Sequence, residues 1–352
     1  MGLSVTYAQE ITTEEKPAHC KCPENDCHFS TAPIGIMGDH VHHGGGFMGS
    51  YRYMNMHMHG NLSGSSPISN SDISDTYMNV PHGMHMNMHM FGIMYGASDN
   101  FTIMGMTMYN SNEMNLTHYM EDTEMDMDMD HSHHHHGSST ESFTTSSAGF
   151  GDFRLSGLYS WVSTEEMSVI SQFGISLPTG SIDERGSSPM MADMKLPYAM
   201  QLGSGTLDAI FGSAFTYNFN PKIFMGSQFN MLYPINKNKL EYAWDTRMNF
   251  NMWYGYKLAE NFSLSGAWKF QYIDGISGID SELITTMAQA ADTDNYGGTW
   301  SNLSFGANLY LPNGILSGVK IGAEYEIPIQ QSVNGIQMAR EKNIWLGIQY
   351  ML

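Results

Sequence analysis

Residues 247–273 read RMNFNMWYGYKLAENFSLSGAWKFQYI, and this stretch decides the fold. Apolar residues, many of them aromatic, recur at every second position from Met248 to Tyr256 and, with one glycine among them, from Phe262 to Tyr272. An alternation with a period of two predicts two β-strands, each with one apolar face and one mostly polar face. The short segment 258–261 between them predicts a tight turn.

The same alternation predicts twelve strands in the whole chain. We expect them at residues 47–59, 84–95, 101–109, 150–161, 168–177, 207–219, 222–233, 243–257, 262–273, 300–311, 318–328 and 342–352. Short turns alternate with longer connections, such as 110–148 and 329–341, and this layout is typical of outer-membrane barrels. Apolar residues alternate up to Leu352, which resembles the C-terminal insertion signal of such barrels.

We therefore predict an all-β fold. The expected architecture is a transmembrane antiparallel up-and-down β-barrel of about twelve strands, with an irregular N-terminal segment. It would lie in the bacterial outer membrane, in contact with outer-membrane lipid.

Composition and charge exclude several classes of protein. The 352 residues carry a formal net charge of −20 and only 15 lysines and arginines, which argues against a nucleic-acid partner. No stretch approaches the roughly 20 consecutive apolar residues of a membrane-spanning helix. The chain shows no nucleophile elbow, phosphate loop or paired-carboxylate signature, so we do not expect an enzyme.

The chain divides into three expected parts. Residues 1–8 are interpreted as the remnant of a signal peptide, with an ordinary disordered end as the alternative. Residues 9–45 form a Cys/His-rich irregular periplasmic segment. Residues 46–352 form the barrel, which carries a Met/His-rich extracellular loop at 110–148.

Methionines recur at alternate positions of three expected strands. They are Met54, Met56, Met58, Met84, Met86, Met88, Met90, Met104, Met106 and Met108. Arg52 shares their face, and a basic charge facing lipid would cost about 2–4 kcal/mol near the midplane. The opposite face carries Phe91 and Ile93, which suit lipid. The sequence therefore predicts that the methionines point into the lumen as one thioether-lined wall.

The chemistry of this wall has two interpretations. Thioethers are soft ligands that select Cu(I), so the wall is a candidate path for copper ions. Methionine is also an adaptable apolar filler of irregular space, and a filler would have no part in metal transfer.

The long loop adds harder ligands. A Met-Asp repeat leads into His131, His133, His134, His135 and His136. Imidazole binds copper and zinc, and carboxylates add charge attraction. The pattern predicts a metal-binding surface loop for copper, with zinc as the alternative ion. A solvated low-complexity loop is the other interpretation.

Three cysteines lie close together near the N-terminus, at Cys20, Cys22 and Cys27, with histidines at His19 and His28. One disulfide with a free thiol and a copper or zinc site are both compatible with this spacing. A metal site here would lie in the periplasm, where a periplasmic metal acceptor would take over the ion.

Five segments of the chain resemble a known family. They read SYRYMNM at 50–56, MNMHMFGIMY at 86–95, GFGDFRL at 149–155, GISLPTGSID at 174–183 and MQLGSGT at 200–206. They are similar to the outer-membrane transporters grouped with the phenol meta-pathway degradation proteins, and in particular to a Met/His-rich subset that looks copper-associated. The resemblance runs from about residue 46 to the end. It implies a barrel and suggests transport, but it supplies no binding residues.

Three functions follow as hypotheses. The first is a barrel that binds copper at the cell surface and transports it along the Met-lined wall. The second is a porin or transporter for small apolar or aromatic compounds. The third is a surface metal buffer that does not conduct.

Overall fold

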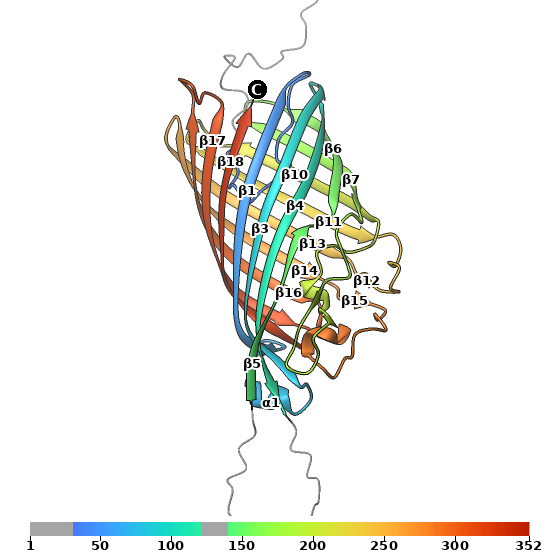
Figure 1. The fold of residues 1–352 in the computed structure, drawn as a ribbon. Coiled ribbons are helices and arrows are strands. Elements are labelled where there is room, and N and C mark those ends of the chain that lie inside the picture. Colours follow the sequence, from blue (N-terminus) through green and yellow to red (C-terminus); the bar gives the residue numbers. More distant parts are fainter. Residues whose placement is uncertain (1–30, 121–139, 352) are drawn as a thin grey trace, which may run out of the picture.

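Twelve antiparallel strands close into a barrel in the computed structural model, which describes residues 31–120 and 140–351 (Figure 1). The barrel strands are β1 (Phe47–Ser63), β3 (Asn79–Ser98), β4 (Phe101–Tyr119), β6 (Phe153–Ser163), β7 (Met167–Leu177), β10 (Asp208–Asn218), β11 (Ile223–Pro234), β13 (Arg247–Ala259), β14 (Phe262–Ile273), β16 (Gly298–Leu311), β17 (Val319–Val333) and β18 (Ile336–Met351). Each pairs with the next barrel strand, and β18 closes the ring on β1, where Met48 faces Met351. The predicted fold and strand number are confirmed.

The remaining elements lie in the connections. They are β2 (Ser66–Ile68), α1 (Asn70–Ser74), β5 (Thr140–Phe150), β8 (Arg185–Gly186), β9 (Met194–Lys195), the 3₁₀ turns η1 (Tyr198–Met200), η2 (Gln289–Ala291) and η3 (Thr293–Asn295), and β12 (Ala243–Trp244) with β15 (Ile276–Ser277). Within residues 31–120 and 140–351, no helix has the length and apolarity needed to cross a membrane.

The predicted alternation is visible on the two faces of the barrel wall. Large apolar side chains are exposed around the outside of the barrel, among them Phe91, Ile93, Phe173, Phe305 and Leu346. Their inward neighbours are polar or sulfur-containing, and many are buried. A continuous apolar exterior on a closed barrel is the surface that a lipid bilayer requires, so the barrel lies in the outer membrane.

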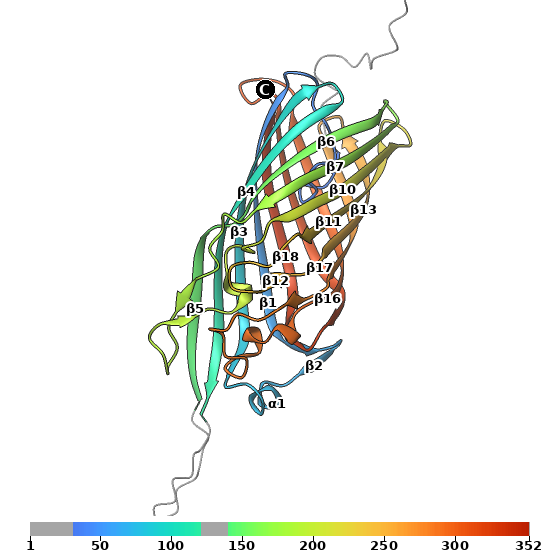
Figure 2. The same ribbon diagram turned by 90° about the vertical axis from the view of Figure 1, so that its right-hand side faces the viewer.

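Two of the expected loops are partly strand. Within 110–148, β4 continues to Tyr119. The C-terminal half of β4 pairs with β5, from Tyr109 opposite Phe150 to Tyr119 opposite Thr140. The hairpin projects beyond the barrel mouth (Figure 2). The alternation continues here because Met114, Leu116 and His118 are buried on one face. Residues 121–139 lie outside the described residues.

The expected long connection at 329–341 is a tight turn. β17 runs to Val333 and β18 starts at Ile336, so only Asn334 and Gly335 connect them. Gly335 has a φ of 54°, and Asn-Gly is the dipeptide that favours two-residue hairpins. The polar residues on both sides, such as Gln331 and Gln337, belong to strands rather than to a loop.

The segment before β1 lies inside the barrel at its short-turn end. The side chains of Ala32, Ile34 and Ile36 are buried. Arg52 Nε donates to the carbonyl oxygen of Ile34 at 2.7 Å, and the Gly35 amide donates to Glu324 at 3.0 Å. Residues 31–42 of the segment expected in the periplasm therefore occupy the lumen, because its polar wall satisfies their backbone groups. Residues 9–30 lie outside the described residues.

Two glycines make room for this segment. Gly322 of β17 and Gly347 of β18 are register partners on the inner wall. A Cβ at Gly322 would lie 2.6 Å from the Cβ of Ile34, and one at Gly347 would lie 2.5 Å from its Cγ1. The lumenal position of Ile34 therefore depends on the absence of side chains at both sites.

We expect Gly347→Leu to displace the N-terminal segment and to raise single-channel conductance in planar bilayers. Overpacking a filled site costs about 1–3 kcal/mol, and expulsion of the segment relieves this strain. Gly266→Leu is the matched control, since a Cβ at Gly266 meets nothing within 4 Å. A Gly347→Leu barrel that conducts like the wild type would contradict this role of Ile34.

Candidate binding site in the barrel lumen

Two cavities follow one another along the lumen. The cavity nearer the long loops, here named the upper cavity although these loops lie at the bottom of Figures 1 and 2, has a volume of about 370 Å³. The cavity nearer the short turns, named the lower cavity, has a volume of about 420 Å³. Both fall in the size range of small-molecule sites. The side chains that line both cavities, and so mark their junction, are Met56, Met86, Met88, Met108, Arg154, Arg247 and Arg340.

The ten methionines of the predicted wall all line these cavities. Those of the upper cavity are Met56, Met58, Met84, Met86, Met88 and Met108, and those of the lower are Met54, Met56, Met86, Met88, Met90, Met104, Met106 and Met108. They form cross-strand pairs, since Met56 lies opposite Met86 on β1 and β3. The predicted inward direction of the wall is confirmed. Two further thioethers, on Met114 and Met338, extend it toward the long loops.

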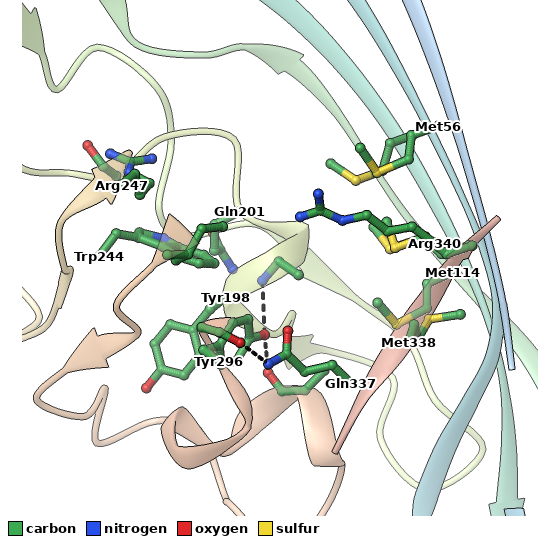
Figure 3. A pocket seen from close by; sticks show the side chains of 18 of the residues that line it. Met56, Met114, Tyr198, Gln201, Trp244, Arg247, Tyr296, Gln337, Met338 and Arg340 are labelled. Carbon is green, nitrogen blue, oxygen red and sulfur yellow. Dashed lines mark hydrogen bonds between the residues drawn. The ribbon is translucent and has the colours of Figure 1, made fainter. Parts of the chain in front are cut away.

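Aromatic side chains from the long loops face the methionines across the upper cavity (Figure 3). Tyr198 packs edge-on against Tyr296 with ring centroids 5.7 Å apart, and Trp244 packs on Tyr296 at 5.2 Å. Burial raises the pKa of Tyr198, so its hydroxyl stays neutral at physiological pH. One side of the cavity is therefore rich in sulfur and the other side is aromatic. The thioethers and the aromatic side chains that form these two sides are all uncharged.

A buried ion pair joins the two loops that carry these aromatics. Lys195 Nζ lies 2.5 Å from Asp280 Oδ2, and both side chains are 2% exposed. The Asp280 amide also donates to the Tyr198 hydroxyl at 2.9 Å. The loops 178–207 and 274–297 are thus tied to each other above the cavity, which fixes the position of the aromatic side.

Three arginines project into the lumen at the junction of the cavities. Arg154 of β6 is the register partner of Met106 on β4, and Arg340 of β18 is the register partner of Met58 on β1. These two arginines therefore flank the methionine wall, one on each side. Arg247 of β13 lies across the lumen from the methionines (Figure 3). It forms a 2.7 Å ion pair with Asp208.

Three of the family-like segments meet beside Arg154, and Asp152 joins them. Its carboxylate accepts from the Gly180 amide at 3.0 Å, the Ser204 amide at 2.8 Å and the Ser204 hydroxyl at 2.7 Å. Gly180 and Gly203 approach so closely that a Cβ on Gly180 would lie 2.7 Å from the Cα of Gly203. The motif residues are therefore structural. They hold the loop 178–207 against the turn that precedes Arg154.

The charge of the lumen is opposite to that of the whole chain. The charged side chains that line the upper cavity are the three arginines and Asp152. In the lower cavity, Lys269 and Glu326 join the arginines, and Lys269 forms ion pairs with Glu324 and Glu326. The lining is therefore positive although the chain carries a net charge of −20. This arrangement favours neutral or anionic molecules over metal cations.

The structure does not test the predicted histidine and cysteine ligands. His131, His133, His134, His135 and His136, and likewise Cys20, Cys22 and Cys27, lie outside the described residues. Within the part of the chain that the structure describes, no group of three or more His, Cys, Asp or Glu side chains is arranged to hold a metal ion. Metal binding at those positions stays a prediction.

The arginines of the site were not singled out from sequence. Arg154 and Arg247 sit in expected strands, whereas Arg340 lies in the connection expected at 329–341. The scarcity of basic residues, 15 in the whole chain, was the available signal. Tyr198 and Tyr296 fall in expected loops, and no sequence pattern marks either residue as part of a site. Nothing local in the sequence shows that these loops fold back over the lumen.

Comparisons with known proteins support the fold. No family model and no curated protein sequence matches the chain. A crystallised outer membrane channel from Pseudomonas putida F1 superposes with a TM-score of 0.60 at 11% identity, covering 89% of this chain and 98% of that one. The resemblance to the phenol meta-pathway family, and to its copper-associated subset, remains a prediction from the sequence.

Two further outer-membrane proteins are more distant. A Pseudomonas aeruginosa FadL homologue gives a TM-score of 0.42 at 7% identity, covering 87% of this chain and 90% of that one. The toluene transporter TbuX of Ralstonia pickettii gives 0.41 at 10% identity, covering 93% and 92%. At these scores neither structure carries an argument about this chain.

We expect Asp152→Ala to loosen the loop 178–207 and to lower the melting temperature. Each amide or hydroxyl left unpaired costs about 1–3 kcal/mol. Limited proteolysis should cut this loop faster, and differential scanning fluorimetry should report the lower melting temperature. Asp193→Ala is the control, because that carboxylate is 73% exposed. Equal proteolysis of the two variants would show that Asp152 does not hold the loop.

Proposed function

We propose that this protein is an outer-membrane channel for small apolar or aromatic compounds, which bind in the upper lumenal cavity on their way through the barrel. The observation that carries the proposal is the lining of that cavity. Methionine thioethers form one side, and Tyr198, Trp244 and Tyr296 form the other. Flexible, polarisable thioethers adapt to ligands of different shape and make favourable contacts with aromatic rings. The similar Pseudomonas putida protein is described as an outer membrane channel.

The charge of the lumen favours this function over cation transport. A unit cation about 8 Å from a guanidinium is repelled by about 2 kcal/mol at an effective dielectric constant of about 20. A passing metal ion would meet Arg154, Arg247 and Arg340 at the junction of the cavities. A neutral aromatic compound meets no such barrier, and arginines can stack on its ring. Arg340 already stacks in this way, 4.1 Å from the ring centroid of Trp300.

We expect Met86→Asn to weaken the binding of 2-phenylethanol about ten-fold or more, while Met86→Leu keeps it close to wild type. Met86 lines both cavities, so a polar amide there removes apolar contact that a leucine retains. Calorimetry on protein in lipid nanodiscs, with empty nanodiscs subtracted, measures the difference. Equal affinities for the Asn and Leu variants would contradict binding in this cavity.

Copper transport is a second candidate function, and the observation in its favour is the cross-strand pairing of the methionines. Met54 lies opposite Met88, Met56 opposite Met86 and Met58 opposite Met84. Paired thioethers on adjacent strands are a soft donor set of the kind that Cu(I) prefers. In this second function the loop histidines His131 and His133–His136 would collect the ion at the surface.

The triple variant Met56→Leu, Met86→Leu and Met106→Leu separates the two functions. Such volume-conserving exchanges usually cost less than about 1.5 kcal/mol each, so the barrel should fold. We expect unchanged binding of 2-phenylethanol and unchanged Cu(I) stoichiometry in the presence of a chelator of known affinity. Loss of one or more bound Cu(I) ions in the triple variant alone would instead establish the wall as a copper site.

A further inference from the structure

Arg154 forms no hydrogen bond or ion pair with any other described residue of the lumen. Its side chain lines both cavities, and its buried Nε has no hydrogen-bond partner among the described residues. The other two arginines are engaged. Arg247 pairs with Asp208, while Arg340 donates to Gln271 at 2.6 Å and stacks on Trp300. A guanidinium in a partly dry lumen without an anion is energetically unfavourable.

The carboxylates nearest to Arg154 are occupied by other groups. Asp152 and Asp208 both interact with it electrostatically. Asp152, however, accepts three hydrogen bonds from Gly180 and Ser204. Asp208 is 1% exposed, and it accepts from Thr206 and from Arg247. Neither carboxylate forms an ion pair or hydrogen bond with Arg154, whose guanidinium therefore keeps donors for an anion that enters the lumen.

The surroundings of Arg154 are apolar on the side of the methionine wall. Its register partner is Met106, and Met86, Met88 and Met108 line the same junction. A molecule bound here would contact the positively charged guanidinium at one end and the thioethers and aromatic rings of the protein along the rest of its length. Such a site is complementary to an amphipathic molecule with one anionic group.

We propose that Arg154 binds the carboxylate of a small aromatic or aliphatic acid whose apolar part occupies the upper cavity. This inference rests on the proposed function and names its substrate class, since the compounds carried would be acids rather than neutral hydrocarbons. The guanidinium offers a planar pair of donors that matches the two carboxylate oxygens, and the positive lining of the lumen attracts the anion toward it.

The test uses two ligands of one skeleton, phenylacetate and 2-phenylethanol, which differ in the anionic group. Calorimetry on the full chain in nanodiscs should show phenylacetate binding at least about ten-fold more tightly, as expected for a charge-assisted contact. Arg154→Gln should abolish this preference, so that the affinities of the variant for the two ligands lie within about two-fold of each other. Lys222→Gln removes the same charge from an exposed turn and should keep the preference.

Each outcome separates the two proposals. Equal wild-type affinities for the two ligands, or a preference that survives Arg154→Gln, overturns the carboxylate site and leaves the channel for apolar compounds standing. Absence of binding for both ligands overturns both proposals. Arg154→Lys keeps the charge but not the paired donors, so it should recover part of the preference if the contact is direct. The wild-type comparison requires no variant and remains decisive if Arg154→Gln does not fold.

Discussion

Closure of the backbone hydrogen-bond ladder is the constraint on which the rest of this structure depends. In a bilayer no water satisfies backbone amides, so a sheet is stable there only without edges. The pairing of β1 with β18 removes the last edge. Once the ring is closed, strand geometry fixes whether each side chain points outward or into the lumen. Along a regular stretch of barrel strand, residues of one parity face outward and residues of the other face the lumen. The methionine wall and the arginines are both consequences of this parity.

A closed ring of twelve strands encloses more space than its own wall can fill. Two groups of residues reduce that space. Residues 31–42 fill the short-turn end, where Gly322 and Gly347 leave room for Ile34. The loops 178–207 and 274–297 cover the other end through the Lys195–Asp280 ion pair. The binding cavity is the volume left between them. Its position along the barrel axis is therefore set by segments outside the barrel strands.

Methionine and arginine have complementary parts in the remaining volume. Thioethers provide an apolar surface that adapts to the shape of a ligand. Guanidinium groups keep their charge even when partly dry, which sets the sign of the local field. Arg154 and Arg340 flank the thioether wall, so apolar contact and positive charge are presented side by side. This combination makes the lumen a poor path for a metal cation and a suitable one for an apolar molecule with an acidic group.

The amino-acid sequence by itself determined the twelve strands, their alternating faces and the inward direction of Met54, Met86 and Met106. These properties depend on a period of two, which is local and can be read from neighbouring residues. The prediction from this alternation misplaced the ends of β4 and β17, because polar residues in a strand resemble those of a loop. The Asn334-Gly335 dipeptide by itself indicates the two-residue turn between β17 and β18.

Only the tertiary structure decided what lies opposite the methionine wall. Tyr198, Arg247 and Tyr296 are distant from it in sequence, and they come to it through loop folding and barrel closure. The same is true of Ile34 in the lumen, which no pattern near residue 34 predicts. Long-range contacts of this kind depend on the shape of the space that the ring encloses, whereas strand parity depends only on the next residue along the chain. The sequence therefore specified the wall of the site, and the folded ring specified the site itself.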